Sequence, residues 1–111
     1  MKFLIFGDLH GGIPEIHYKN FDAIITPGDF CSGDLRKYMF IALKKNSKNS
    51  QKIEWYDLIG KKKAESMVKK SILNGRKVLE NLNSFDIPVY IVPGNWDWTK
   101  EDGKQTSWSY L

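Results

Sequence analysis

Cysteine is almost absent from this chain of 111 residues: Cys31 is the only one, so no disulfide can form within the chain. Structural disulfides belong to oxidising compartments, and their absence favours the reducing cytoplasm. Long apolar runs are absent too. No stretch approaches the roughly 20 residues that a membrane-spanning helix needs, and the amino terminus lacks the apolar core and cleavage site of a secretion signal. These absences predict a cytoplasmic protein with no membrane segment.

Charge of one sign is only in modest excess, with a formal net charge of +4. Its main source is three lysine runs, Lys44-Lys45, Lys61-Lys62-Lys63 and Lys69-Lys70. Solvated helix faces usually account for such runs, and no aromatic residues are interleaved with them as in many nucleic-acid-binding surfaces. The charge alone is therefore a weak argument for a nucleic-acid partner. At 41% hydrophobic residues, the length and composition suit one small globular domain spanning residues 1–111.

Three short apolar runs, each followed at once by a polar turn, are the most informative feature of the chain. The runs cover residues 3–6, 23–26 and 89–92. The polar side chains that follow them are Asp8 and His10, then Asp29, then Asn95 and Asp97. Continuous apolar runs are typical of buried parallel strands, and ligands bind beyond the carboxyl ends of such strands. The three turns are therefore expected to meet at one edge of a parallel sheet.

The segments between these runs predict flanking helices, and hence an α/β fold. Pro14 favours a short helix over residues 13–18, and Ser32 or Asp34 can cap the next helix. Apolar residues recur at helical spacing from Leu35 to Leu43, and a second apolar stripe predicts a long helix over residues 62–82. A polar loop is expected over residues 46–51, and a short helical piece over 53–59.

The side chains of the three turns are metal-ligand types. Asp8 and His10 are one residue apart, so in an extended segment they leave the chain on the same side and can bind one ion. Asp29 can be shared between two ions, because a carboxylate offers two oxygens, and Asn95 offers an amide oxygen to the second ion. Such mixed ligands suit Mn, Fe, Zn, Co or Ni. Two ions about 3.5–4 Å apart would hold a phosphate ester and activate a water for attack on phosphorus.

In order and spacing, Gly7-Asp8-Leu9-His10, Gly28-Asp29 and Gly94-Asn95-Trp96-Asp97 resemble the first three motifs of the calcineurin-like metallophosphoesterases. That family has a four-layer αββα sandwich and a dinuclear centre that hydrolyses phosphomonoesters or phosphodiesters. The resemblance implies that Asp8 and His10 bind the first metal, Asp29 bridges the two, and Asn95 binds the second. It also implies that Asp97 is an acid of the catalytic site that lies behind the ligands and orients the neighbouring side chain. Two divalent ions, with Mn the first choice, are the implied cofactors, and a phosphate ester is the implied substrate.

The chain departs from the family pattern at two places. Trp96 stands where the family usually has a histidine after the motif asparagine, and an indole can neither transfer that proton nor ligate a metal. The family's later histidine motifs have no counterpart, because His10 and His17 are the only histidines. The chain thus resembles the amino-terminal half of such an enzyme, a truncated domain. The alternative to a complete phosphoesterase is a non-catalytic remnant, or a half-domain that needs a partner chain.

A half of this fold would leave one face of its sheet uncovered, although parallel sheets are normally covered on both faces. Phe3, Ile5, Ile24 and Ile91 are the expected exposed residues, together with aromatics of the tail. The expected partner at this face is a second copy of the chain or a separate carboxyl-terminal chain. Outside the turns, Cys31 is expected to be a buried thiol and His17 a surface residue.

Overall fold

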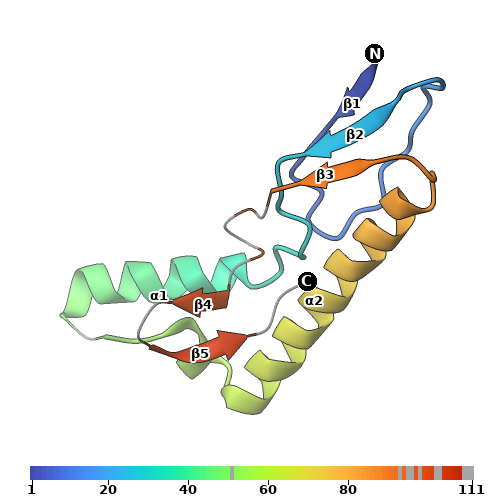
Figure 1. Ribbon diagram of the computed structural model, residues 1–111. Helices are drawn as coiled ribbons and strands as arrows, with labels where there is room; N and C mark the ends of the chain where they lie inside the picture. The colour runs from blue at the N-terminus through green and yellow to red at the C-terminus, as the bar shows by residue number, and fades with distance from the viewer. Residues whose placement is uncertain (51, 93, 95–96, 98, 102–103, 109–111) are drawn as a thin grey trace.

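A sheet of three parallel strands lies at the amino-terminal end of the structure, a computed structural model that describes residues 1–50, 52–92, 94, 97, 99–101 and 104–108. Its strands are β1 (Phe3–Ile5), β2 (Ala23–Thr26) and β3 (Val89–Ile91), with β2 in the centre (Figure 1). Leu4, Ile24 and Val89 lie directly opposite one another across the sheet. The apolar runs thus form the predicted strands, and the α/β class is confirmed.

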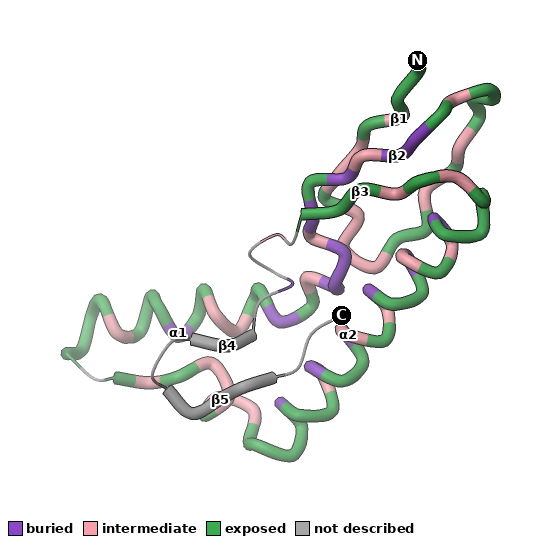
Figure 2. The backbone as a smooth tube through the Cα atoms, viewed as in Figure 1, coloured by how far each residue is buried: buried purple, intermediate pink, exposed green. Residues whose placement is uncertain are grey.

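One face of the sheet is covered by the long helix α2 (Lys61–Asn83). Ile24 of β2 packs with Phe30, Val78 and Leu82 in the hydrophobic core, and Leu4 and Val89 pack against this cluster. Buried residues accordingly lie in β2, in the loop that follows it and on α2 (Figure 2). Burying these side chains supplies the main favourable term for this part of the fold.

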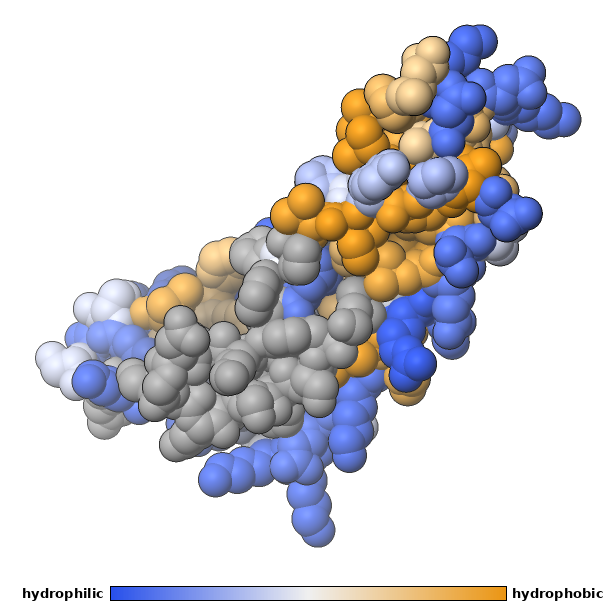
Figure 3. All heavy atoms as spheres, viewed as in Figure 1, coloured by the Kyte–Doolittle hydropathy of each residue, from blue (hydrophilic) through white to orange (hydrophobic). Residues whose placement is uncertain are grey.

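Among the described residues, no helix or strand covers the other face of the sheet. Ile5 and Tyr90 lie on either side of Ile25 in the register and are 65% and 61% exposed. Phe3 and Val92 are exposed as well, as is Ile91 at the end of β3 on the face of Val89, and apolar surface gathers over the sheet (Figure 3). Exposure was correctly expected for Phe3, Ile5 and Ile91. For Ile24 the expectation was wrong, because this side chain points to α2 and is fully buried.

The helix α1 (Arg36–Asn49) and the 3₁₀ turn η1 (Trp55–Leu58) precede α2. The short helical piece is where the sequence predicts it, but α1 continues through most of the expected loop over 46–51. Asn46 explains this extension, since its side-chain amide donates to the Ile53 carbonyl oxygen (2.9 Å) and accepts from the Ile53 N–H (2.8 Å). These two bonds bind the last turns of α1 to the segment before η1.

The predicted helix over residues 13–18 is wrong, because this segment crosses from β1 to β2 without helical structure. Ile13, His17 and Tyr18 are exposed, so a helix here would bury no apolar stripe. Isolated helices this short are unstable in water without such packing. The predicted caps of α1 are wrong too, as no side chain caps its first turn.

Beyond β3, residues of the tail form the antiparallel strands β4 (Thr99–Glu101) and β5 (Lys104–Trp108), apart from the parallel sheet (Figure 1). The tail aromatics expected at the uncovered face lie outside the side chains that the structure describes. The molecule measures 54 × 26 × 25 Å, and its radius of gyration is 16.6 Å. A compact domain of this length would have about 13 Å. Among the described residues, no helix has the length and apolarity to cross a membrane.

Replacing Leu82 by alanine should lower the free energy of unfolding by about 2–5 kcal/mol, because the side chain is fully buried between α2 and the sheet. Leu73→Ala, on the same helix at a 55% exposed position, is the matched control and should stay within about 0.5 kcal/mol of the unchanged protein. Urea unfolding followed by circular dichroism measures both. Equal losses in the two variants would contradict this packing.

Candidate metal centre

The turns after β1 and β2 run side by side and hydrogen-bond to each other. The Asp8 N–H donates to the Gly28 carbonyl oxygen (3.2 Å), and the His10 N–H donates to the Asp29 carbonyl oxygen (2.8 Å). The Gly11 N–H continues this pattern to the Phe30 carbonyl oxygen (2.7 Å). Backbone bonds of this kind satisfy the polar groups of both turns and fix their spacing. The two hydrogen-bonded turns therefore form one rigid unit that carries the side chains of both.

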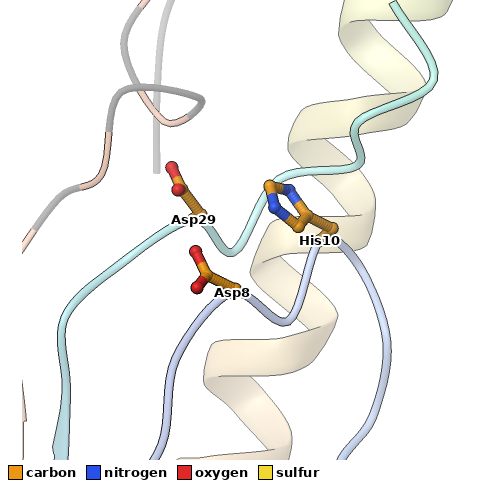
Figure 4. Close-up of side chains that lie close together, drawn as sticks. All are labelled: Asp8, His10 and Asp29. Carbon is orange, nitrogen blue, oxygen red and sulfur yellow. The ribbon is translucent and has the colours of Figure 1, made fainter. Parts of the chain in front are cut away.

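The side chains of Asp8, His10 and Asp29 come together on this pair of turns. Each offers one ligand atom, and these atoms lie within 4.8 Å of one another. Figure 4 shows the two carboxylates close together, with the imidazole beside them and α2 behind. Asp8 is exposed, while His10 and Asp29 are half-buried, so the group is open to solvent on one side. The structure thus brings together three of the four predicted ligands.

The backbone at all three residues is left-handed, with φ of 56° at Asp8, 46° at His10 and 59° at Asp29. Positive φ is uncommon outside glycine, and it persists where the surrounding structure enforces it. The prediction that Asp8 and His10 lie on one side of an extended segment is therefore wrong, because neither residue has extended backbone. Their side chains converge because the chain turns sharply at each of them. The spacing of Asp8 and His10 in the sequence does not indicate these left-handed turns.

Asp97 holds the third turn against the second. Its carboxylate is 3% exposed and accepts hydrogen bonds from four backbone N–H groups: Gly94 (2.8 Å), Asp29 (2.8 Å), Phe30 (2.9 Å) and Cys31 (3.0 Å). Buried carboxylates need such partners, because desolvation of the charge is otherwise costly. Asp97 thus fixes the backbone of Asp29 from behind. Whether it also orients the neighbouring side chain stays a prediction.

Two glycines let the second and third turns approach closely. A Cβ on Gly28, which has φ of 102°, would overlap the backbone of Gly94, and a Cβ on Gly94 would overlap the Asp29 carboxylate. Only glycine fits both positions without displacing its neighbours. The glycines of the Gly-Asp and Gly-Asn pairs thus have a physical reason, because they let the two backbones come together.

Asn95, the fourth predicted ligand, lies outside the described residues, as does Trp96. Cys31 is buried as expected; burial, and next the Asp97 carboxylate, raise the pKa of its thiol to about 12. The thiol is therefore neutral near pH 7 and unsuited to nucleophilic attack. His17 lies on the surface, as expected, and pairs with Glu15 at 3.6 Å.

The family comparison agrees with this geometry. The model of the calcineurin-like phosphoesterase family matches residues 1–111, the whole chain. The chain belongs to this family, as the resemblance of its three motifs indicates. Comparison with curated proteins and with solved structures gave no significant match.

Membership in the family implies divalent metal ions and phosphate ester substrates. The donor set of this chain fits that cofactor, because two carboxylates and an imidazole are ligands for borderline and hard divalent ions. The His10 ring also has a backbone partner. His10 Nδ1 lies 3.4 Å from the Cys31 carbonyl oxygen, and a proton donated there would leave the lone pair for a metal ion on Nε2.

Asp97→Asn should lower the free energy of unfolding by about 3 kcal/mol, because an amide has one acceptor oxygen and turns an NH₂ group toward backbone N–H donors. Asp86→Asn is the matched control, since Asp86 is exposed and left-handed backbone tolerates asparagine. Chemical denaturation gives both values. An unchanged stability in Asp97→Asn would show that the buried carboxylate does not join the turns.

Gly94→Ala should weaken Mn²⁺ binding by about 10-fold or more, because the added methyl group would displace the Asp29 carboxylate. Gly33→Ala is the control: it also places a methyl group near the site, but at an ordinary 3.7 Å from His10 Nδ1. Isothermal titration with Mn²⁺ compares the two variants. Equal affinities would argue against Asp29 as a ligand.

Proposed function

We propose that the chain is a metal-dependent phosphoesterase whose described residues supply the first half of a dinuclear site. The observation that carries this proposal is the convergence of Asp8, His10 and Asp29, with ligand atoms within 4.8 Å of one another, in a chain of this family. Asp8 and His10 would hold one ion, Asp29 would be shared, and Asn95 would hold the second. Mn²⁺ is the first ion to test, and Fe, Zn, Co and Ni suit the same ligands.

The charges of the site support a cofactor. Two carboxylates this close would repel the anionic phosphate of a substrate, so the residues alone make a poor phosphate site. Bound divalent ions reverse this sign, polarise the phosphoryl oxygens and make water nucleophilic near neutral pH. The protein's own part is then to hold the ligands rigidly: Asp97 fixes the Asp29 backbone, and the Cys31 carbonyl oxygen orients His10.

The residue at position 96 bears on the substrate class. The indole N–H of Trp96 is too weak an acid to protonate a leaving alkoxide, so the group that departs must be stable without protonation from that position. Esters with acidic leaving groups, and phosphodiesters more than monoesters of simple alcohols, fit this condition. The cytoplasm is the proposed location, because a chain with a single cysteine forms no internal disulfide and suits a reducing compartment.

A second candidate is a half-domain that binds metal and becomes active only with a partner. The uncovered sheet face favours it, because Ile5, Tyr90 and Val92 are all more than 60% exposed. Residues that complete the site would then come from a second copy or from a separate carboxyl-terminal chain. A remnant without activity is the limiting form of this candidate.

Mn²⁺-dependent hydrolysis of bis-p-nitrophenyl phosphate by the purified chain tests the proposal. Asp29→Asn should lower the rate by about 100-fold or more, because losing even groups behind the ligands costs 10- to 100-fold at metal sites. Asp86→Asn, a distant exposed carboxylate, should leave the rate unchanged.

The dependence on protein concentration separates the two candidates. A rate proportional to concentration means that one chain suffices, and a steeper rise means that self-association completes the site. Metal binding without hydrolysis at any concentration would leave the half-domain with a separate partner. A well-folded chain that binds no divalent ion would contradict both.

A further inference from the structure

Beside the metal centre, an open cavity of about 580 Å³ lies between the first turns of α1 and the amino-terminal half of α2. The two helices diverge at this point (Figure 1). The residues that line the cavity are Gly33, Asp34, Arg36, Lys37, Phe40 and Met67. Its volume falls within the range of small-molecule sites, which is roughly 300–1,000 Å³.

The cavity adjoins the candidate ligands through Gly33. This glycine lines the cavity, and a Cβ at its position would lie only 3.7 Å from His10 Nδ1. The loop that carries Gly33 is anchored to α2, because the buried Ser71 hydroxyl donates to the Ser32 carbonyl oxygen (2.9 Å). A molecule bound at the metal centre can therefore extend past His10 into a preformed space.

The chemistry of the lining combines positive charge with an aromatic ring. Arg36 and Lys37 bring two cations, and guanidinium and ammonium groups bind phosphate. The Lys37 ammonium lies 4.9 Å from the centre of the Tyr38 ring and would turn from it to contact a phosphate. Phe40 follows Arg36 by one helical turn on the same face and is 60% exposed, so its ring is available for stacking. Asp34 is one carboxylate against two cations and can accept from a hydroxyl or amino group.

We propose that this cavity binds the nucleoside part of a nucleotide substrate that carries a second phosphate. The base would stack on Phe40, and the second phosphate would contact Arg36 and Lys37, while the scissile phosphate lies at the metal centre. This assignment rests on the proposed phosphoesterase function for the position of the scissile group. It names a substrate class, phosphorylated nucleotides, that the metal ligands by themselves do not select.

Equilibrium binding of adenosine 3′,5′-bisphosphate tests the cavity without requiring turnover. Lys37→Gln should weaken binding by about 10-fold, through loss of a charge-assisted contact, and Phe40→Ala by at least about 5-fold, through loss of stacking. The controls are Lys44→Gln and Leu43→Ala, which are exposed positions further along α1 and outside the cavity. They should bind as the unchanged protein does. Unphosphorylated adenosine should bind more weakly and be insensitive to Lys37→Gln.

The outcomes separate this proposal from the function on which it rests. Binding that depends on Lys37 and Phe40 supports the nucleotide cavity even if no ester is hydrolysed. Mn²⁺-dependent hydrolysis together with equal bisphosphate binding in all four variants would overturn the cavity and leave the phosphoesterase standing. No binding to the unchanged protein, with or without Mn²⁺, would overturn it as well. Circular dichroism of each variant confirms that the helix is intact.

Discussion

The buried carboxylate of Asp97 is the contact on which the arrangement of the site depends. It accepts from four backbone N–H groups, one in its own turn and three in the turn after β2. Parallel strands place their turns at the same edge, but strand pairing does not fix how those turns lie relative to one another. A buried anion that needs several donors does so, because any rearrangement leaves it unsatisfied. Asp29 is thereby held in place through its backbone N–H, which donates to the Asp97 carboxylate.

The same rigidity explains how the site tolerates its unfavourable features. Three residues with left-handed backbone, two of them aspartates with neighbouring carboxylates, would relax apart in a flexible loop. Hydrogen bonds between the first two turns and the close backbone approach at Gly28 and Gly94 prevent that relaxation. A preorganised ligand set then gains its full interaction with a divalent ion, since little ordering remains to be done on binding.

The two faces of the parallel sheet differ in what the described residues place against them. The face of the sheet against α2 carries the core, and the opposite face exposes large apolar side chains, which are typical of interaction surfaces. The sequence predicts the strands and α2 well, because an apolar run or stripe must be buried somewhere. It fails where tertiary contacts decide: residues 13–18 lack a packing surface, Asn46 extends α1 by bonding to Ile53, and Ile24 faces the helix.

The sequence by itself determined the class of fold, the family and the identity of the candidate ligands. Ligand type and strand pattern are local properties: a carboxylate or imidazole directly behind an apolar run is visible in one dimension. Only the tertiary structure decided that Asp8 and His10 converge through left-handed turns, that Asp97 binds the backbone around Asp29, and that a basic, aromatic cavity opens beside His10. These depend on which backbone groups and helices meet in space, and contacts between residues such as Asp29 and Asp97 leave no periodicity in the chain.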